Sequence, residues 1–142
     1  MFEAALLSHI RNDAALDQYL SVYQGGAAVF SEEAPEGVLV PYVIFSISRL
    51  METGSPSVEL FNVYVDYFDN TTGTGRSRAD SRKAGQRLEF LLDQVNLTSD
   101  RYDTIRLFME SGGPVNDPDP RVIHYNLQFS ARAGRKAWAN QL

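Results

Sequence analysis

Four segments of the chain alternate between apolar and polar residues, and this pattern limits the folds available to it. The alternation is cleanest over residues 122–131, where Ile123, Tyr125, Leu127 and Phe129 share one side. A period of two predicts a β-strand with one buried and one solvent-facing side. The other three predicted strands cover residues 40–49, 58–68 and 101–110. A sheet built from such strands needs helices over one face only.

Two segments have the apolar spacing of amphipathic helices, residues 2–11 and residues 77–95. Asn12-Asp13 is expected to cap a short turn after the first, and Ser77 with Asp80 fits an N-terminal cap for the second. A short strand is expected near 27–30. The order α, short β, β, β, α, β, β predicts an α+β fold, with a mostly antiparallel β-sheet of four to five strands and helices packed on one face.

The 142 residues predict one domain, 1–142, with a basic C-terminal tail at about 132–142 that contains Trp138. Residues 50–57, 69–75 and 111–120 are rich in Gly, Pro or small polar residues and are expected to be loops. The longest uncharged apolar stretch, residues 38–48, is interrupted by Pro41 and is far shorter than the roughly 20 residues of a membrane span. We therefore expect no membrane association and an assembly built in the cytoplasm.

Motifs that carry chemistry are absent or incomplete. The chain has no cysteine, and His9 and His124 have no partners at metal-ligand spacing. The run from Thr72 to Arg76 lacks the lysine and the glycine spacing of a phosphate-binding loop. We expect no metal and no cofactor. A small enzyme that uses His124 with Asp66, these two with Ser130, or a pair of carboxylates is an alternative, although almost any chain of this size permits such a set.

Charge is segregated along the chain. The net charge is −5, from 13 basic and 18 acidic residues, but the basic residues are concentrated in the predicted second helix and in the tail. Opposite charges on separate surfaces steer one protein onto another and set the register of docking. We therefore predict an interface between copies of the chain, with a solvated helix face or a nucleic-acid-binding surface as the alternatives. The predicted interface residues are Arg76, Arg78, Arg82, Lys83 and Arg87 on the basic side, and Glu32, Glu33 and Glu36 on the acidic side.

The order of elements resembles the tail-completion, or tail-terminator, proteins of long-tailed bacteriophages, which are minor tail proteins. The resemblance covers nearly the whole chain and is a pattern of elements in which no single motif is diagnostic. It is carried by the helix at 2–11, Val29-Phe30, Ala34-Pro35, Pro41-Tyr42-Val43-Ile44-Phe45, the strand from Phe61 to Tyr67, the helix at 76–95 and the closing strand from Tyr125 to Phe129.

This resemblance implies a structural virion protein of the tail or neck with no catalytic residues. Such a protein forms a ring, usually hexameric, that caps the head-proximal end of the tail tube, stops its polymerisation and joins the head. The implied partners are other copies of the chain, the tail tube protein and a head-proximal connector or neck protein, with only passive contact to DNA in the channel. A head-closure or adaptor protein of the neck is the main alternative.

Overall fold

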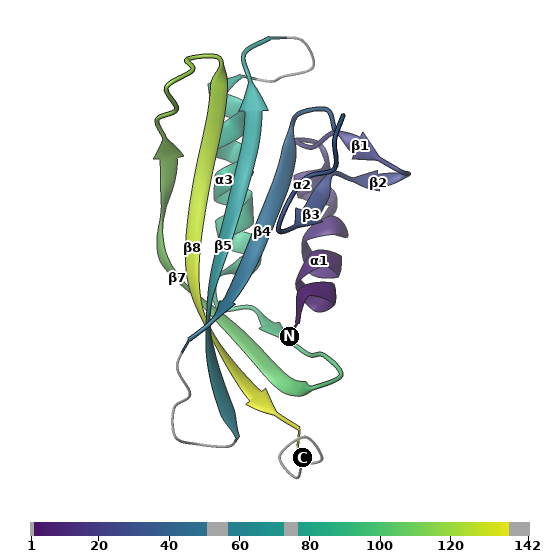
Figure 1. Cartoon of the computed structure of the whole chain (residues 1–142), viewed down its shortest axis with the longest axis vertical. Coiled ribbons are helices and arrows are strands. Elements are labelled where there is room, and N and C mark those ends of the chain that lie inside the picture. The colour runs from purple at the N-terminus through teal and green to yellow at the C-terminus, as the bar shows by residue number, and fades with distance from the viewer. Residues whose placement is uncertain (1, 51–56, 73–76, 137–142) are drawn as a thin grey trace.

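The computed structural model describes residues 2–50, 57–72 and 77–136 as a β-sheet with helices against it (Figure 1). The helices are α1 (Glu3–Arg11), α2 (Ala14–Asp17) and α3 (Arg78–Leu92). The strands are β1 (Val22–Tyr23), β2 (Gly26–Ala27), β3 (Val29–Ser31), β4 (Tyr42–Arg49), β5 (Val58–Asn70), β6 (Asn96–Leu97), β7 (Tyr102–Val115) and β8 (Val122–Arg135). The predicted combination of a sheet with helices is confirmed, and the described residues are mostly β with small helices.

The main sheet has six strands in the order β3-β4-β5-β8-β7-β6. Every neighbouring pair is antiparallel except β3 and β4, so the predicted mostly antiparallel arrangement is correct. The predicted count of four to five strands is wrong. The edge strands β3 and β6 are three and two residues long, and segments this short show no readable alternation. The remaining strands, β1 and β2, form a separate hairpin that projects from the side of the sheet (Figure 1).

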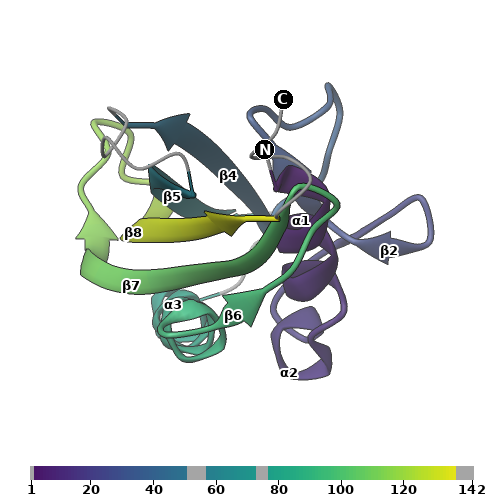
Figure 2. The ribbon, with the colours of Figure 1, turned by 90° about the horizontal axis from the view of Figure 1, so that it is seen from below.

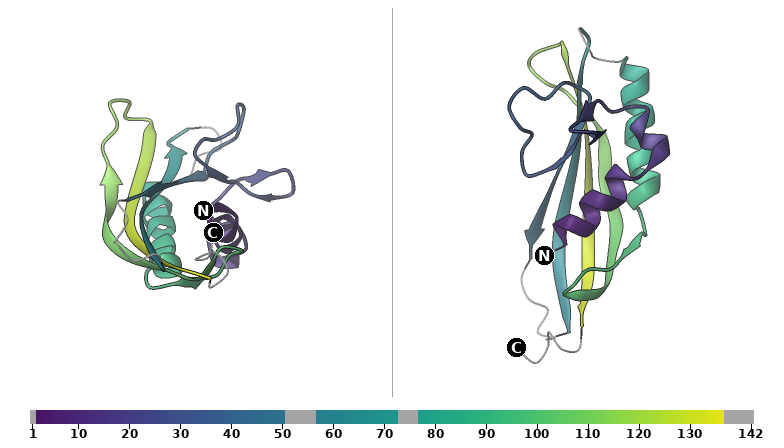
Figure 3. Two further views of the ribbon diagram at one scale, coloured as in Figure 1. Left: turned by 60° about the horizontal axis from the view of Figure 1, so that its bottom comes forward. Right: turned by 90° about the vertical axis from the view of Figure 1, so that its right-hand side faces the viewer.

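All the helices lie on one face of the sheet (Figure 3), and Figure 2 shows α3 and α1 on the same side of it. The apolar side of β5 is fully buried beneath them, as are Leu6 and Ile10 of α1 and Leu88 and Leu92 of α3. These side chains belong to one continuous core. The faces predicted to be buried on β4, β5 and β8 are confirmed.

The hairpin of β7 and β8 is longer than the alternation predicted. Residues 111–115 were expected in a loop but continue β7, and residues 132–135 were expected in a tail but continue β8. The loop prediction failed because a register shift between Met109 and Ser111 lets pairing continue past the glycines. A Cβ on Gly112 would lie 2.5 Å from Met109 Cε and 2.6 Å from Leu127 Cδ2, so a larger residue here would require both flexible side chains to move. Residues 137–142, with Trp138, lie outside the described residues.

Helix α3 begins as the sequence predicts and ends earlier. Ser77 accepts a hydrogen bond from the Asp80 amide at 3.1 Å, which is the predicted cap. The helix stops at Leu92 rather than near residue 95. There the Gln94 amide donates to the Leu107 carbonyl at 2.7 Å and the Asp93 side chain accepts from the Met109 amide at 2.9 Å. Pairing with β7 thus replaces the last helical turn.

Gly85 sets how closely α3 approaches the sheet. A Cβ at this position would lie 2.5 Å from Cδ1 of Tyr125 on β8, well inside van der Waals contact. Ala84 and Leu88, on the same side of the helix, are fully buried. Glycine in a helix interior costs about 1 kcal/mol relative to alanine, and here it permits close packing of the helix on the central strands.

We expect Gly85→Ala to lower the free energy of unfolding by up to about 2 kcal/mol. Overpacking a core costs about 1–3 kcal/mol, and the gain in helix propensity of about 1 kcal/mol offsets part of that cost. Urea denaturation measures the change. In a Tyr125→Leu background the same substitution should cost less, because the ring atoms that meet the new methyl group are gone. A stabilised Gly85→Ala single variant would contradict the contact.

Candidate interaction surfaces

The first half of α3 carries three exposed basic side chains, Arg78, Arg82 and Lys83, which we call the α3 basic surface. Arg78 Nη2 donates to the Pro120 carbonyl at 3.1 Å, which ties the helix start to the turn between β7 and β8. Within the described part of the chain, Arg82 and Lys83 have no ion-pair partner. Arg76, the remaining predicted member near the helix start, lies outside the described residues.

Arg87, also predicted to lie at an interface, is bound within the chain. Its Nε and Nη2 atoms donate to the two carboxylate oxygens of Asp13 at 2.8 and 2.7 Å. Asp13 also caps α2, accepting from the Leu16 amide at 2.9 Å, as the sequence predicts. The hydrogen bond from Arg87 holds the pKa of Asp13 below its usual value, although burial opposes it, and the same bond raises the pKa of Arg87. This pair joins α2 to α3 and neutralises one predicted interface charge.

Three glutamates, Glu32, Glu33 and Glu36, are exposed in the segment between β3 and β4, which we call the acidic loop. The segment lies on the side of the sheet away from the helices (Figure 3). Glu32 has a φ of 71°, a left-handed conformation that non-glycine residues seldom adopt. Because the sheet separates the acidic loop from the α3 basic surface, the two sets of charge do not meet within one chain.

One charge of the predicted basic tail is neutralised by an ion pair at the end of the sheet where β8 finishes. Arg135 forms an ion pair with Glu59, and Arg49 Nη2 lies 3.1 Å from the same carboxylate. Tyr102 donates its hydroxyl to Glu59 as well, and burial raises the pKa of Tyr102. Glu59 is almost completely buried, so these partners compensate a charge that would otherwise be costly to desolvate. Arg135 therefore has a structural role in the described part of the chain.

The open face of the sheet holds His124 and Asp66. His124 Nε2 lies 2.6 Å from Asp66 Oδ1, which also accepts from Asn126 at 2.8 Å, and the imidazole stacks on Phe68 at 4.4 Å. Ser130, the third member of the alternative catalytic set, lies six residues further along β8, roughly 20 Å away. The geometry does not assemble that triad.

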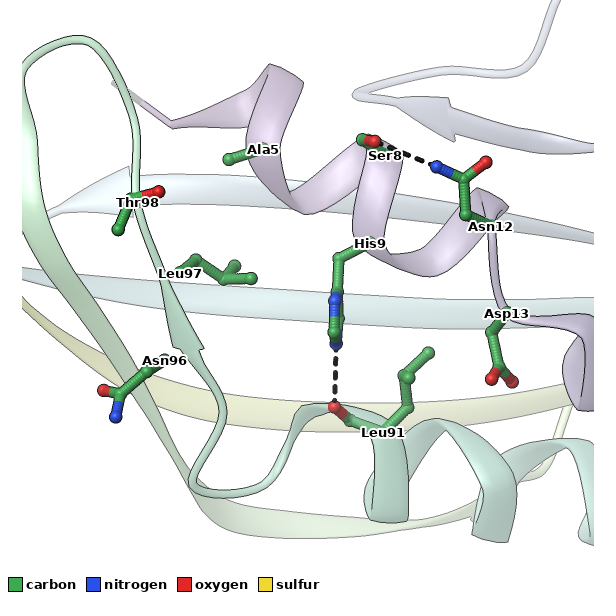
Figure 4. Close-up of a pocket in the computed structure, with 9 residues that line it drawn as sticks. All are labelled: Ala5, Ser8, His9, Asn12, Asp13, Leu91, Asn96, Leu97 and Thr98. Atoms are coloured by element: carbon green, nitrogen blue, oxygen red, sulfur yellow. Dashed lines mark hydrogen bonds between the residues drawn. The ribbon is translucent and has the colours of Figure 1, made fainter.

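A surface hollow of about 550 Å³ lies between α1, the end of α3 and β6 (Figure 4). His9 points from α1 to the last turn of α3, with Nε2 3.2 Å from the Leu91 carbonyl oxygen. Asn12 donates to Ser8 at 3.1 Å, and the Asp13 carboxylate is occupied by Arg87. The His9–Leu91 contact and the Asp13–Arg87 pair thus join the N-terminal helices to α3. No described group of three or more His, Asp or Glu side chains is placed to hold a metal ion.

Sequence reasoning missed a second hollow, of about 440 Å³, on the open face. Two arginines line it, Arg106 of β7 and Arg132 of β8, which are directly paired across the strands. Arg106 had no predicted role and Arg132 was placed in the tail. The β7–β8 register is the information that brings them together, and periodicity alone does not supply it. The lining residues are Val58, Asn96, Thr104, Arg106, Phe108, Arg132 and Gly134.

Among the described residues, none of the helices has both the length and the apolar character needed to cross a bilayer.

Comparison with known proteins relates this chain to solved structures only. No protein-family model and no curated protein matches it. One similar solved chain belongs to the virion of a native gene transfer agent particle; it is 18% identical, the match covers 92% of each chain, and the TM-score is 0.69. A second solved protein, whose name describes no function, is 12% identical over 84% of this chain and 91% of its own, with a TM-score of 0.57. At these identities the likeness shows a shared fold.

The Asp13–Arg87 pair predicts a specific dependence of stability on pH. Because the pKa of Asp13 is lower in the folded chain than in the unfolded one, its contribution is complete above about pH 4 and is lost as the pH falls through the folded value. Asp13→Asn keeps a capping side chain and removes the charge. The difference in unfolding free energy between the parent and this variant should therefore shrink below about pH 4, as urea denaturation at several pH values would measure.

Asp17→Asn is the matched control, since it removes a neighbouring exposed carboxylate that has no ion-pair partner among the described residues. Its effect should vary little over the same range. Asp13→Ala should cost about 1 kcal/mol more than Asp13→Asn at neutral pH because the cap is lost too. An Asp13→Asn effect that stays constant down to about pH 2.5 would refute the assignment.

Proposed function

We propose that this chain is a structural virion protein, a tail terminator that forms a ring at the head-proximal end of the tail tube, stops its polymerisation and presents the surface that joins the head. The observation that carries the proposal is the fold shared over 92% of both chains with a component of a gene transfer agent virion. The sequence resemblance to tail terminators agrees with it from the order of elements alone.

The distribution of charge supports a ring. Subunits that meet head to tail need two unlike surfaces, and contacts of this kind close into a ring when the rotation permits. The α3 basic surface and the acidic loop are exposed on opposite sides of the sheet. Each exposed ion pair contributes only about 0–1 kcal/mol, so several together with apolar contacts are needed to hold neighbours. In this proposal the partners are other copies of the chain, the tail tube protein and a neck protein.

The proposed role is non-enzymatic. Of the catalytic sets considered from the sequence, His124 and Asp66 do meet, at 2.6 Å, on the open face of the sheet. The triad is not assembled, since Ser130 lies six residues further along β8. The polar groups around His9 bind one another and the backbone. The proposed location is the tail or neck of a particle assembled in the cytoplasm of its host.

Particles assembled without this chain test the role. We expect overlong tail tubes that lack heads, because nothing would cap the growing tube, and electron microscopy of the lysate measures tube length directly. Resupplying the purified chain should restore uniform length. Tubes of normal length that fail to join heads would instead identify a head-closure or adaptor protein, and unaffected particles would reject a neck role.

Reversing the α3 basic surface tests its place between subunits. The triple variant Arg78→Glu, Arg82→Glu, Lys83→Glu should weaken self-association about tenfold or more while circular dichroism stays unchanged, because all three side chains are exposed. The neutral triple variant with glutamine is the matched control and should have an intermediate effect. Native mass spectrometry reports the oligomers. If the reversed variant associates as the parent does, this surface is not the interface.

A further inference from the structure

The hollow between β7 and β8 places two positive charges side by side without a counter-charge. Arg106 and Arg132 are direct cross-strand partners, an arrangement that disfavours pairing of the strands when the charges are alike. Both are exposed, and neither forms an ion pair with a described residue. Arg106 lies over the Phe108 ring at 5.4 Å, a contact that leaves its charge uncompensated. The two guanidinium groups are therefore available to an anion.

The rest of the hollow suits a carboxylate. Residues 105, 107, 131 and 133 face the buried core, so residues 104, 106, 132 and 134 face the open side of the sheet. Gly134 lets Thr104 pack closely beside it, since a Cβ would lie 2.9 Å from Thr104 Oγ1. Asn96 and Thr104 add amide and hydroxyl donors to the lining. Arginine presents a planar fork of donors that matches a carboxylate in a bidentate contact.

The chain itself carries exposed carboxylates that fit this hollow. The acidic loop places Glu32, Glu33 and Glu36 next to β3, at one edge of the sheet, and none of them has an ion-pair partner among the described residues. The hollow lies toward β6 and β7, at the other edge. The acidic loop is on the face away from the helices (Figure 3), and the residues that line the hollow face the same side. Ser31, where the acidic loop begins, is level with Leu127 of β8, five residues from Arg132 along that strand. A second copy displaced across the strands and along them by roughly 17 Å brings its acidic loop over the hollow of the first.

We propose that the acidic loop of one copy inserts carboxylates between Arg106 and Arg132 of the next copy. This inference rests on the proposed ring and gives the acidic loop a partner surface on the open face, separate from the α3 basic surface. A contact between opposite edges of the same sheet is heterologous and repeats from copy to copy. Duplex DNA is the less suitable occupant, because it requires a continuous basic track, whereas this hollow holds one arginine pair on a chain of net charge −5.

A charge exchange between two variants tests the contact. The hollow variant carries Arg106→Glu and Arg132→Glu, and the loop variant carries Glu32→Lys, Glu33→Lys and Glu36→Lys. Each variant alone should have a dissociation constant for self-association at least about 30-fold higher than that of the parent. Like charges facing each other across an interface cost this much. Mixed in equal amounts, the two should assemble again, because each hollow then meets a loop of opposite charge.

Matched controls separate this contact from loss of folding and from the α3 basic surface. Arg106→Lys with Arg132→Lys keeps both charges and loses the planar forks, so it should weaken association less than the reversal. The helix triple variant mixed with the loop variant should assemble no further than the helix variant does alone, since a basic hollow still meets the basic loop of the loop variant. Native mass spectrometry measures all mixtures, and circular dichroism checks the fold.

Restored assembly in the exchange mixture is the supporting result, because a misfolded variant would not recover on mixing. Rings that persist in both single variants would overturn the inference and leave the proposed ring standing. A parent chain that stays monomeric at the highest concentration would overturn the self-contact, while tube length in particles lacking the chain would still decide the terminator role. Anisotropy with a labelled DNA duplex completes the set: binding lost only in the hollow variant, with self-association unchanged, would assign the hollow to a polyanion instead.

Discussion

The packing of α3 on the centre of the sheet is the contact on which the rest of the structure depends. Gly85 brings the helix backbone against Tyr125 of β8, and Ala84, Leu88 and Leu92 complete the buried side of the helix. Because α1 and α3 cover the same face, the other face of β4, β5, β8 and β7 is left open. That asymmetry places the acidic loop and the two-arginine hollow on one side and the α3 basic surface on the other.

Electrostatics divides the charged residues into two groups with different uses. Asp13 with Arg87, and Glu59 with Arg49 and Arg135, are ion pairs that join one element to another inside the chain. A buried carboxylate such as Glu59 demands this compensation, since desolvating an unpaired charge is costly. Other charges are exposed and form no ion pair with a described residue, so they remain available to a neighbouring molecule. They belong to the α3 basic surface, the arginine hollow and the acidic loop. Net charge or charge along the sequence does not distinguish the two groups, which is why Arg87 and Arg135 looked equivalent to Arg82.

Periodicity predicted the regular parts of the fold and failed where the backbone departs from regularity. The strands β4, β5 and β8 were predicted with their buried sides correct, because alternation reports directly which side chains leave water. The end of β7 was missed because its bulge at Met109 and its glycines break the alternation while the hydrogen-bonded pairing continues. The edge strands were misjudged because two or three residues are too few to show a period. Among the proposed interaction surfaces, the acidic loop and the start of α3 are exposed as the sequence prediction requires, and the arginine hollow was not predicted.

By itself, the sequence determined the class of the fold, the one-sided burial of the sheet, the helix caps at Asp13 and Ser77, and the absence of thiol chemistry, since each depends on local spacing or on composition. Tertiary structure alone decided which charged side chains form ion pairs within the chain and which are exposed to solvent. It also decided that Arg106 and Arg132 are neighbours, although they are far apart along the chain, because strand register is set by the packing of the whole sheet. Strand register decides which side chains lie next to each other on a surface, and local sequence carries little information about that register.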